Sequence, residues 1–162
     1  MRGAMTAGAL ASGLLVAGGA LGQSVVLTGL SGQAATFTAA QLAATPHASA
    51  TLKLGGGRSE DCAGVPLTLL LQRVGAPAGK ALKGPELADL VVVGASDGYR
   101  VVLALAETDP MVSDRKILLA DRCGGAPLPD NEGPFRLVVT GDLRPARSAR
   151  MVTSIQVRRA LP

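Results

Sequence analysis

Arginines near the C-terminal end of this 162-residue chain are the residues with the clearest chemistry. They are Arg144, Arg147, Arg150, Arg158 and Arg159. A guanidinium group can hold a phosphate or a carboxylate through two parallel hydrogen bonds, so arginines that converge favour anion binding. The formal net charge is +4, and this late segment carries much of the excess. The alternative interpretation is a solvated basic face around a loop.

Cys62 and Cys123 are the two cysteines of the chain. In an oxidising compartment they could form one disulfide. The alternative is two separate thiols, one of them reactive or a metal ligand. A structural zinc site needs four ligands, and the chain adds only one histidine, His47, to these cysteines. His47 follows Pro46, and no G-x-S-x-G sequence accompanies it, so we expect a surface or strand-end residue and not a catalytic triad.

The sequence disfavours two other kinds of site, a nucleic-acid surface of stacked rings and a glycine-rich phosphate loop. Aromatic residues make up 2% of the chain, so a nucleic-acid surface of stacked rings is excluded. The run Gly55-Gly56-Gly57 resembles a phosphate cradle, but Glu60 and Asp61 put negative charge where the anion would lie. A hairpin or lid loop is the better interpretation of residues 55–61.

The elements that must position these residues begin after a targeting segment. Residues 1–22 hold one charge, Arg2, then an uncharged Ala/Gly/Leu/Val run that closes on Ala20-Leu21-Gly22. This pattern is typical of a secretory signal peptide, and we predict cleavage after Gly22. The alternative is an uncleaved membrane anchor. With cleavage, the domain is residues 23–162, it has no stable membrane span, and its location is periplasmic or secreted.

Hydrophobic patterns in residues 23–162 predict an α+β domain with a mixed, mainly antiparallel sheet and a few short helices. Asp97-Gly98 lies between two apolar runs and predicts a hairpin turn. Thr38 is suited to cap a helix that Thr45-Pro46 ends. The predicted helices are 39–44 and 67–74, and the predicted strands are 24–28, 48–54, 90–95, 99–103, 116–120, 136–140 and 152–157.

Three stretches together resemble one family. Residues 64–71 resemble a G-V-x-L-x-x-L-L helix start, and residues 95–101 resemble an A-x-D-G-Y hairpin. Residues 124–139 resemble N-G-x-P-L-P followed by G-x-P-x-R-L-V-V-P-G. In this order they are similar to the molybdopterin-binding domain of the sulfite oxidase family, over residues 64–157.

This resemblance implies a sulfite-oxidase-like α+β fold and a molybdopterin cofactor held by basic side chains and loop amides. The family's basic residue on the R-L-V-V strand corresponds to Arg136. Its K-x-x-K-W segment corresponds to residues 147–151, with arginine at both basic positions. The resemblance therefore implies cofactor contacts by Arg136, Arg147, Ser148 and Arg150, and an anion pocket where Arg136 meets the Arg147/Arg150 pair.

The chain also departs from the family pattern. A catalytic member ligates molybdenum through a cysteine that lies about a strand and a loop before the G-V-x-L helix, and no cysteine is there. Asn131-Glu132 replaces the histidine before the R-L-V-V strand, and a carboxylate there would repel a phosphate. Thr140 and Met151 replace a proline and a tryptophan.

Two functions follow from these matches and departures. The first is a small exported module that lacks the usual metal-ligating cysteine and binds an anionic small molecule or a protein partner. The alternative is a molybdopterin-dependent oxidoreductase that uses Cys62 as its molybdenum ligand. The two differ in whether the purified protein carries the metal.

Overall fold

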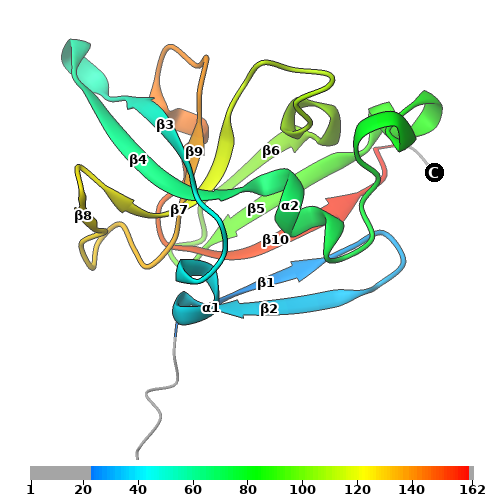
Figure 1. Ribbon diagram of the computed structural model, residues 1–162, viewed down its shortest axis with the longest axis horizontal. Helices are drawn as coiled ribbons and strands as arrows, with labels where there is room; N and C mark the ends of the chain where they lie inside the picture. Colours follow the sequence, from blue (N-terminus) through cyan, green and yellow to red (C-terminus); the bar gives the residue numbers. More distant parts are fainter. Residues whose placement is uncertain (1–22, 161–162) are drawn as a thin grey trace, which may run out of the picture.

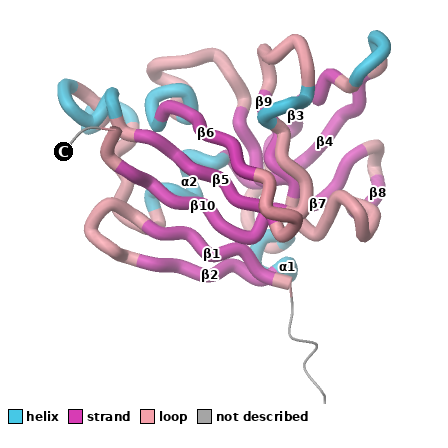
Figure 2. Tube along the Cα trace, turned by 180° about the vertical axis from the view of Figure 1, so that it is seen from behind, coloured by secondary structure: helices cyan, strands magenta, loops and turns pink. Residues whose placement is uncertain are grey.

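The computed structural model describes residues 23–160, and two β-sheets make up its frame (Figure 1). The predicted signal peptide, residues 1–22, lies outside the described residues. Among the helices of residues 23–160, none has the length and hydropathy needed to cross a bilayer. Figure 2 shows the strands of the first sheet side by side, with those of the second sheet at one end.

The first sheet has five strands and joins the two ends of the described chain. β1 pairs in parallel with β10, and the other neighbours are antiparallel. A parallel pair in an otherwise antiparallel sheet makes the sheet mixed. In spatial order the strands are β2 (Ala34–Thr38), β1 (Ser24–Thr28), β10 (Val152–Arg158), β5 (Leu90–Ala95) and β6 (Arg100–Ala104).

The second sheet is antiparallel throughout the described residues and carries both cysteines. Its long strand β7 pairs with β4 on one edge, while β8 and β9 pair with successive parts of its other edge. The strands are β3 (Ala48–Lys53), β4 (Ser59–Pro66), β7 (Ile117–Cys123), β8 (Ala126–Pro127) and β9 (Arg136–Val139).

Two short helices and several 3-10 turns connect the strands. Thr38 caps α1 (Ala39–Ala43) reciprocally with Gln41, as the polar residue before the helix predicts. Helix α2 (Leu67–Gln72) has Pro66 as its N-cap, and it buries Leu67, Leu70 and Leu71 while Leu69 stays exposed. The 3-10 turns are η1 (Gly55–Gly57), η2 (Gly79–Ala81), η3 (Gly84–Ala88), η4 (Leu105–Thr108) and η5 (Pro145–Arg147).

The larger hydrophobic core contains residues from both sheets and from α2, including the fully buried Phe135, Leu27 and Leu119. A smaller cluster gathers Leu52, Leu118 and Val138 with the two cysteines. Strand alternation explains this division, because Leu137 and Val139 of β9 join the larger core while Val138 joins the smaller one.

The observed elements confirm the predicted fold class and correct its details. The Asp97-Gly98 turn joins β5 to β6, and Gly98 supplies the positive φ of 85° that the turn requires. The predicted loop over residues 55–61 is too long, because β4 begins at Ser59. Strands β2 and β8 were also not predicted. Cys62 lies within this strand.

Candidate functional site

A pocket of about 380 Å³ contains three arginines from separate parts of the chain. We call it the arginine pocket after Arg58, Arg136 and Arg150, which line it together with Tyr99 and Ser148. Its volume lies at the lower end of the range for small-molecule sites, roughly 300–1,000 Å³. With Asp97 and Glu132 also in the lining, three cationic side chains face two acidic ones. The pocket is therefore suited to an anion.

Backbone pairing brings Arg136 and Arg150 together. The amide of Leu137 donates to the carbonyl of Ala149 at 2.8 Å, and the amide of Met151 donates to that of Glu132 at 2.9 Å. The segment that carries Arg150 thus runs beside the start of β9. Both arginines line the arginine pocket, and their contact with a cofactor stays a prediction.

Arg136 is the most buried cation of this pocket. Its residue is 5% exposed, and its Nη1 donates to the carboxylate of Glu132. Its Nε is buried and has no hydrogen-bond partner. Buried donors are nearly always paired in folded proteins, and the described residues supply no acceptor for this one. An oxygen of an anionic ligand is the acceptor that suits a guanidinium best.

Glu132 lies between the two cations that would hold an anion. Besides its hydrogen bond to Arg136, its Oε1 is 3.8 Å from Nη1 of Arg150. The carboxylate expected to repel a phosphate therefore occupies part of the site. An incoming anion must share these guanidinium groups with Glu132 or displace its side chain.

Arg147 does not join the pocket, which corrects the expected Arg147/Arg150 pair. Its Nη2 and Nε donate to Asp142 at 2.7 and 2.9 Å, and its Nη1 donates to Glu107 at 3.2 Å. Beyond η5 the backbone leaves helical geometry at Ser148, with φ −85° and ψ 70°. The two arginines therefore point to different surroundings.

Ser148 does line the pocket, and it is almost fully buried. Its Oγ accepts a hydrogen bond from the amide of Val139 at 3.0 Å. A hydroxyl that accepts one hydrogen bond keeps its own O–H to donate. Ser148 can thus accept a hydrogen bond from the backbone of β9 and donate one to a ligand.

The ion pairs around Asp142 predict a pH-dependent part of the stability. The pKa of Asp142 is lowered below its ordinary value of 3.8, and the hydrogen bond from Arg147 is the largest cause. Burial raises this pKa, whereas the hydrogen bond from Arg115 lowers it further. A carboxyl whose pKa is lowered by folding stabilises the fold above its unfolded pKa, and this stabilisation is lost as the pH falls through the folded value.

We therefore expect Asp142→Asn to cost stability at neutral pH and to cost progressively less as the pH falls below the ordinary pKa of the carboxyl. Urea denaturation of both proteins across this pH range measures the difference. A difference that stays constant down to the most acidic pH would contradict the assignment.

Tyr99 ties the β5–β6 turn to the segment that carries the pocket. Its hydroxyl donates to the carbonyl of Ala146 at 2.7 Å, although the residue is 49% exposed. Tyr99→Phe removes this bond and should lower the free energy of unfolding by about 0.5–1 kcal/mol in urea denaturation. Val102→Ala, at a similarly exposed residue of β6, is the matched control. Equal stability of Tyr99→Phe and the native protein would show that the bond contributes nothing.

Arg58 and Leu54 line the pocket and were missed by the sequence analysis. They flank the glycine turn η1, in which Gly56 and Gly57 have positive φ values of 70° and 75°. A cation directly after a glycine run is the signal that could have drawn attention to Arg58. The sequence analysis predicted a hairpin loop at residues 55–61, but it did not predict that this loop would line the pocket.

Cys62 and Cys123 form a disulfide between directly paired residues of β4 and β7. Of the two alternatives left open by the sequence, the structure has the disulfide and not two separate thiols. Both residues are buried in the smaller core cluster, and neither lines the arginine pocket. In this oxidised form Cys62 has no thiolate to offer, so its predicted role as a molybdenum ligand requires the reduced chain.

His47 lies directly before β3, at the strand end where it was expected. Its Nδ1 is 2.6 Å from the carbonyl oxygen of Thr45, and its Nε2 is 3.1 Å from Oδ2 of Asp121. Both ring nitrogens thus have partners within the fold, and the residue does not line the arginine pocket.

Comparisons with known proteins identify the family and the fold. The family model described as "Oxidoreductase molybdopterin binding domain" matches residues 23–161. Among solved structures, the sulfane dehydrogenase SoxCD from Paracoccus pantotrophus is similar, with a TM-score of 0.63 and 21% identity. The match covers 83% of this chain and 38% of that chain. At this identity the likeness shows a shared fold. A search of curated proteins gave no match.

Proposed function

Because this chain belongs to the oxidoreductase molybdopterin-binding domain family, we propose that it is an exported module whose arginine pocket binds the phosphate-bearing part of a molybdopterin-class ligand. The observation that carries the proposal is the buried Nε of Arg136, which lacks a partner within the described residues. Desolvated charged donors bind anions more strongly than donors in water do, since the surrounding dielectric is lower.

The lining residues fit a phosphate. Arg136 and Arg150 would supply charged donors from two adjacent segments, and Arg58 would add a third from the hairpin tip. The O–H of Ser148, on the same segment as Arg150, would add a neutral donor. When bound with its metal, the cofactor supplies redox chemistry at molybdenum. The residues described here would hold its phosphate and orient it.

The same residues do not fit thiolate ligation of the metal. Among the described residues that line the pocket, none contains sulfur. The family's ligating cysteine is expected a strand and a loop before α2, which corresponds to β4 and the turn around η1. That turn contributes Leu54, Gly55 and Arg58 to the pocket, and none of these residues can supply a thiolate. This favours a binding role over oxidoreductase activity.

Export is the second part of the proposal. It is supported by the charge and hydropathy pattern of residues 1–22 and by the disulfide, which persists in oxidising compartments. A cleaved N-terminus at Gln23 in protein recovered outside the cytoplasm would agree with it. Retention of residues 1–22 on the recovered protein would contradict it.

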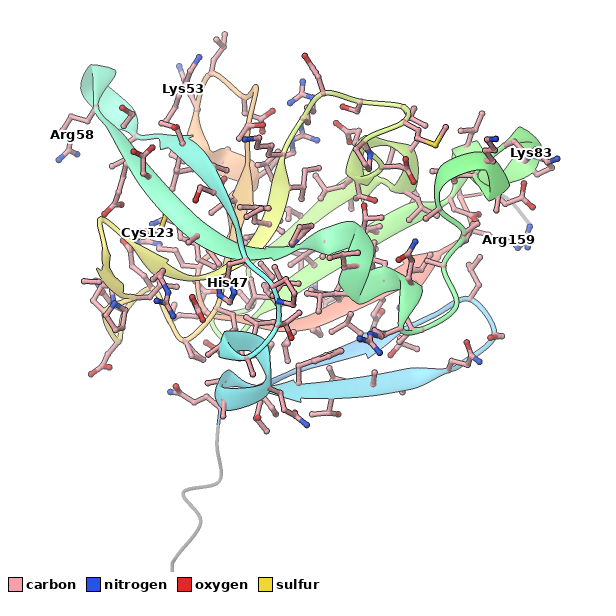
Figure 3. The ribbon with its side chains drawn as sticks, in the orientation of Figure 1. His47, Lys53, Arg58, Lys83, Cys123 and Arg159 are labelled. Atoms are coloured by element: carbon pink, nitrogen blue, oxygen red, sulfur yellow. A yellow bond between two sulfur atoms is a disulfide. The ribbon has the colours of Figure 1, made fainter. Side chains whose placement is uncertain are left out.

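The test is to purify the protein from cells that make molybdopterin, then to measure pterin by fluorescence after oxidation and molybdenum by elemental analysis. We expect phosphorylated pterin without stoichiometric molybdenum. Arg150→Gln should reduce the retained pterin, while Lys83→Gln, an exposed cation at the far end of the molecule, should not (Figure 3).

Two outcomes would overturn the proposal. Protein without pterin would contradict ligand binding in the arginine pocket. Stoichiometric molybdenum that is lost in Cys62→Ser would establish the alternative, an oxidoreductase that ligates the metal through Cys62. The same measurement on reduced and oxidised protein would then show in which form the metal binds.

A further inference from the structure

A second and larger hollow, of about 640 Å³, adjoins the arginine pocket. We call it the hairpin groove. Its walls are residues 53–59, at the tip of the β3–β4 hairpin, and residues 143–145, in the loop after β9. Both segments project from the same end of the molecule (Figure 1). The groove shares Leu54, Gly55, Arg58 and Pro145 with the arginine pocket, so the two hollows are neighbours.

The hairpin groove is cationic and lacks acidic side chains among its described lining residues. Lys53, Arg58 and Arg144 line it. Within residues 23–160, none of these three makes an ion pair with an acid. Figure 3 shows Lys53 and Arg58 on the projecting hairpin. Like charges gathered in a hollow raise the local concentration of oppositely charged partners.

An apolar side chain lies among these cations. Leu143 is 87% exposed, the highest value among the large hydrophobic residues described. On the opposite wall, Gly55, Gly56 and Gly57 have open space where a side chain would start. A bare backbone on one wall and an uncovered leucine on the other leave room for another chain to approach closely.

We propose that the hairpin groove docks an acidic, extended segment of a partner protein, in which an apolar side chain covers Leu143. Small-molecule sites bury most of their ligand, roughly 70–90% of its surface. Two walls alone leave a small ligand largely exposed, whereas an extended chain needs contact only along its length. The charges would speed encounter and set the register, and the apolar contact would slow release.

This proposal goes beyond ligand binding in the arginine pocket, and the two can fail separately. Lys53, Leu143 and Arg144 line the groove and not the pocket. Substitutions at these three residues therefore test docking while the residues proposed to hold the phosphate stay intact. Retention of pterin by the same variants reports on the pocket.

The probe is a fluorescein-labelled peptide with the core Asp-Glu-Leu-Glu-Asp, and its control has the core Asn-Gln-Leu-Gln-Asn. Fluorescence anisotropy with the full chain should show binding of the acidic peptide that weakens as sodium chloride rises from about 0.05 to about 0.3 M. Lys53→Gln and Arg144→Gln should each weaken it about threefold. Leu143→Ser should weaken it about fivefold.

Lys83→Gln is the matched control, because Lys83 is an exposed cation at the opposite end of the molecule (Figure 3). It should leave the affinity unchanged. The proposal is overturned if the acidic peptide does not bind, if the amide peptide binds equally well, or if Lys83→Gln weakens binding as much as Lys53→Gln. It is also overturned if Lys53→Gln and Arg144→Gln abolish pterin retention, which would make the groove an extension of the ligand pocket.

Discussion

Arg136→Met is expected to lower the affinity for a phosphorylated pterin by at least about thirtyfold, because it removes the buried charged donor of the pocket. Isothermal titration calorimetry of the purified domain measures this affinity. Methionine approximates the apolar stem of arginine, so packing around β9 is largely kept. Native-like affinity in this variant would show that the unpaired Nε of Arg136 does not contact the ligand.

Substitution of Glu132 is expected to change the affinity for the phosphorylated pterin in the opposite direction. Its carboxylate holds Arg136 and lies 3.8 Å from Arg150, so Glu132→Gln removes a competing negative charge. The affinity for the phosphorylated pterin should rise roughly tenfold. Because Arg136→Met leaves Glu132 without its partner, the double variant Arg136→Met/Glu132→Gln separates lost binding from lost folding. A folded double variant that binds as tightly as the native protein would contradict the assignment.

Replacing both Cys62 and Cys123 with alanine is expected to lower the free energy of unfolding by about 2–4 kcal/mol, because the bridge restricts the unfolded chain. The two residues are 61 positions apart in sequence and join β4 to β7. Both lie in the smaller core cluster, so their removal also loses apolar packing. Urea denaturation without reductant measures the change.

Reductant is the control for the prediction about the double cysteine variant. It should destabilise the native protein and leave the double alanine variant unchanged, because that variant has no bridge to reduce. Equal unfolding curves for the native protein with and without reductant would contradict a structural role for the bridge. Pterin retention in the alanine variant should persist, since neither cysteine lines the arginine pocket.

Several elements could be predicted because their causes are local. Thr38 and Gln41 form the cap of α1 within one turn, and Gly98 supplies the turn between β5 and β6. The apolar stretch at residues 24–28 becomes β1. The fold class and the resemblance to the sulfite oxidase family rest on such local motifs taken in order, and the family match over residues 23–161 confirms them.

Strand β4 could not be predicted, because its residues carry little strand preference of their own. Residues 59–66 mix polar, small and proline residues. They form a strand because β3 and β7 pair with them on both sides. Strand formation at such positions is decided by neighbours across the sheet and not by the segment itself.

The sequence by itself determined the ingredients of the candidate site: arginines able to bind an anion, a family motif that places Arg136 on a strand, and no cysteine at the family's metal-binding position. Only the tertiary structure decided which arginines meet. Arg150 reaches Arg136 through backbone pairing, Arg147 turns to Asp142 and Glu107, and Arg58 arrives on a distant hairpin. The reason is physical: side-chain direction depends on backbone geometry and on charges contributed by segments far apart in the chain.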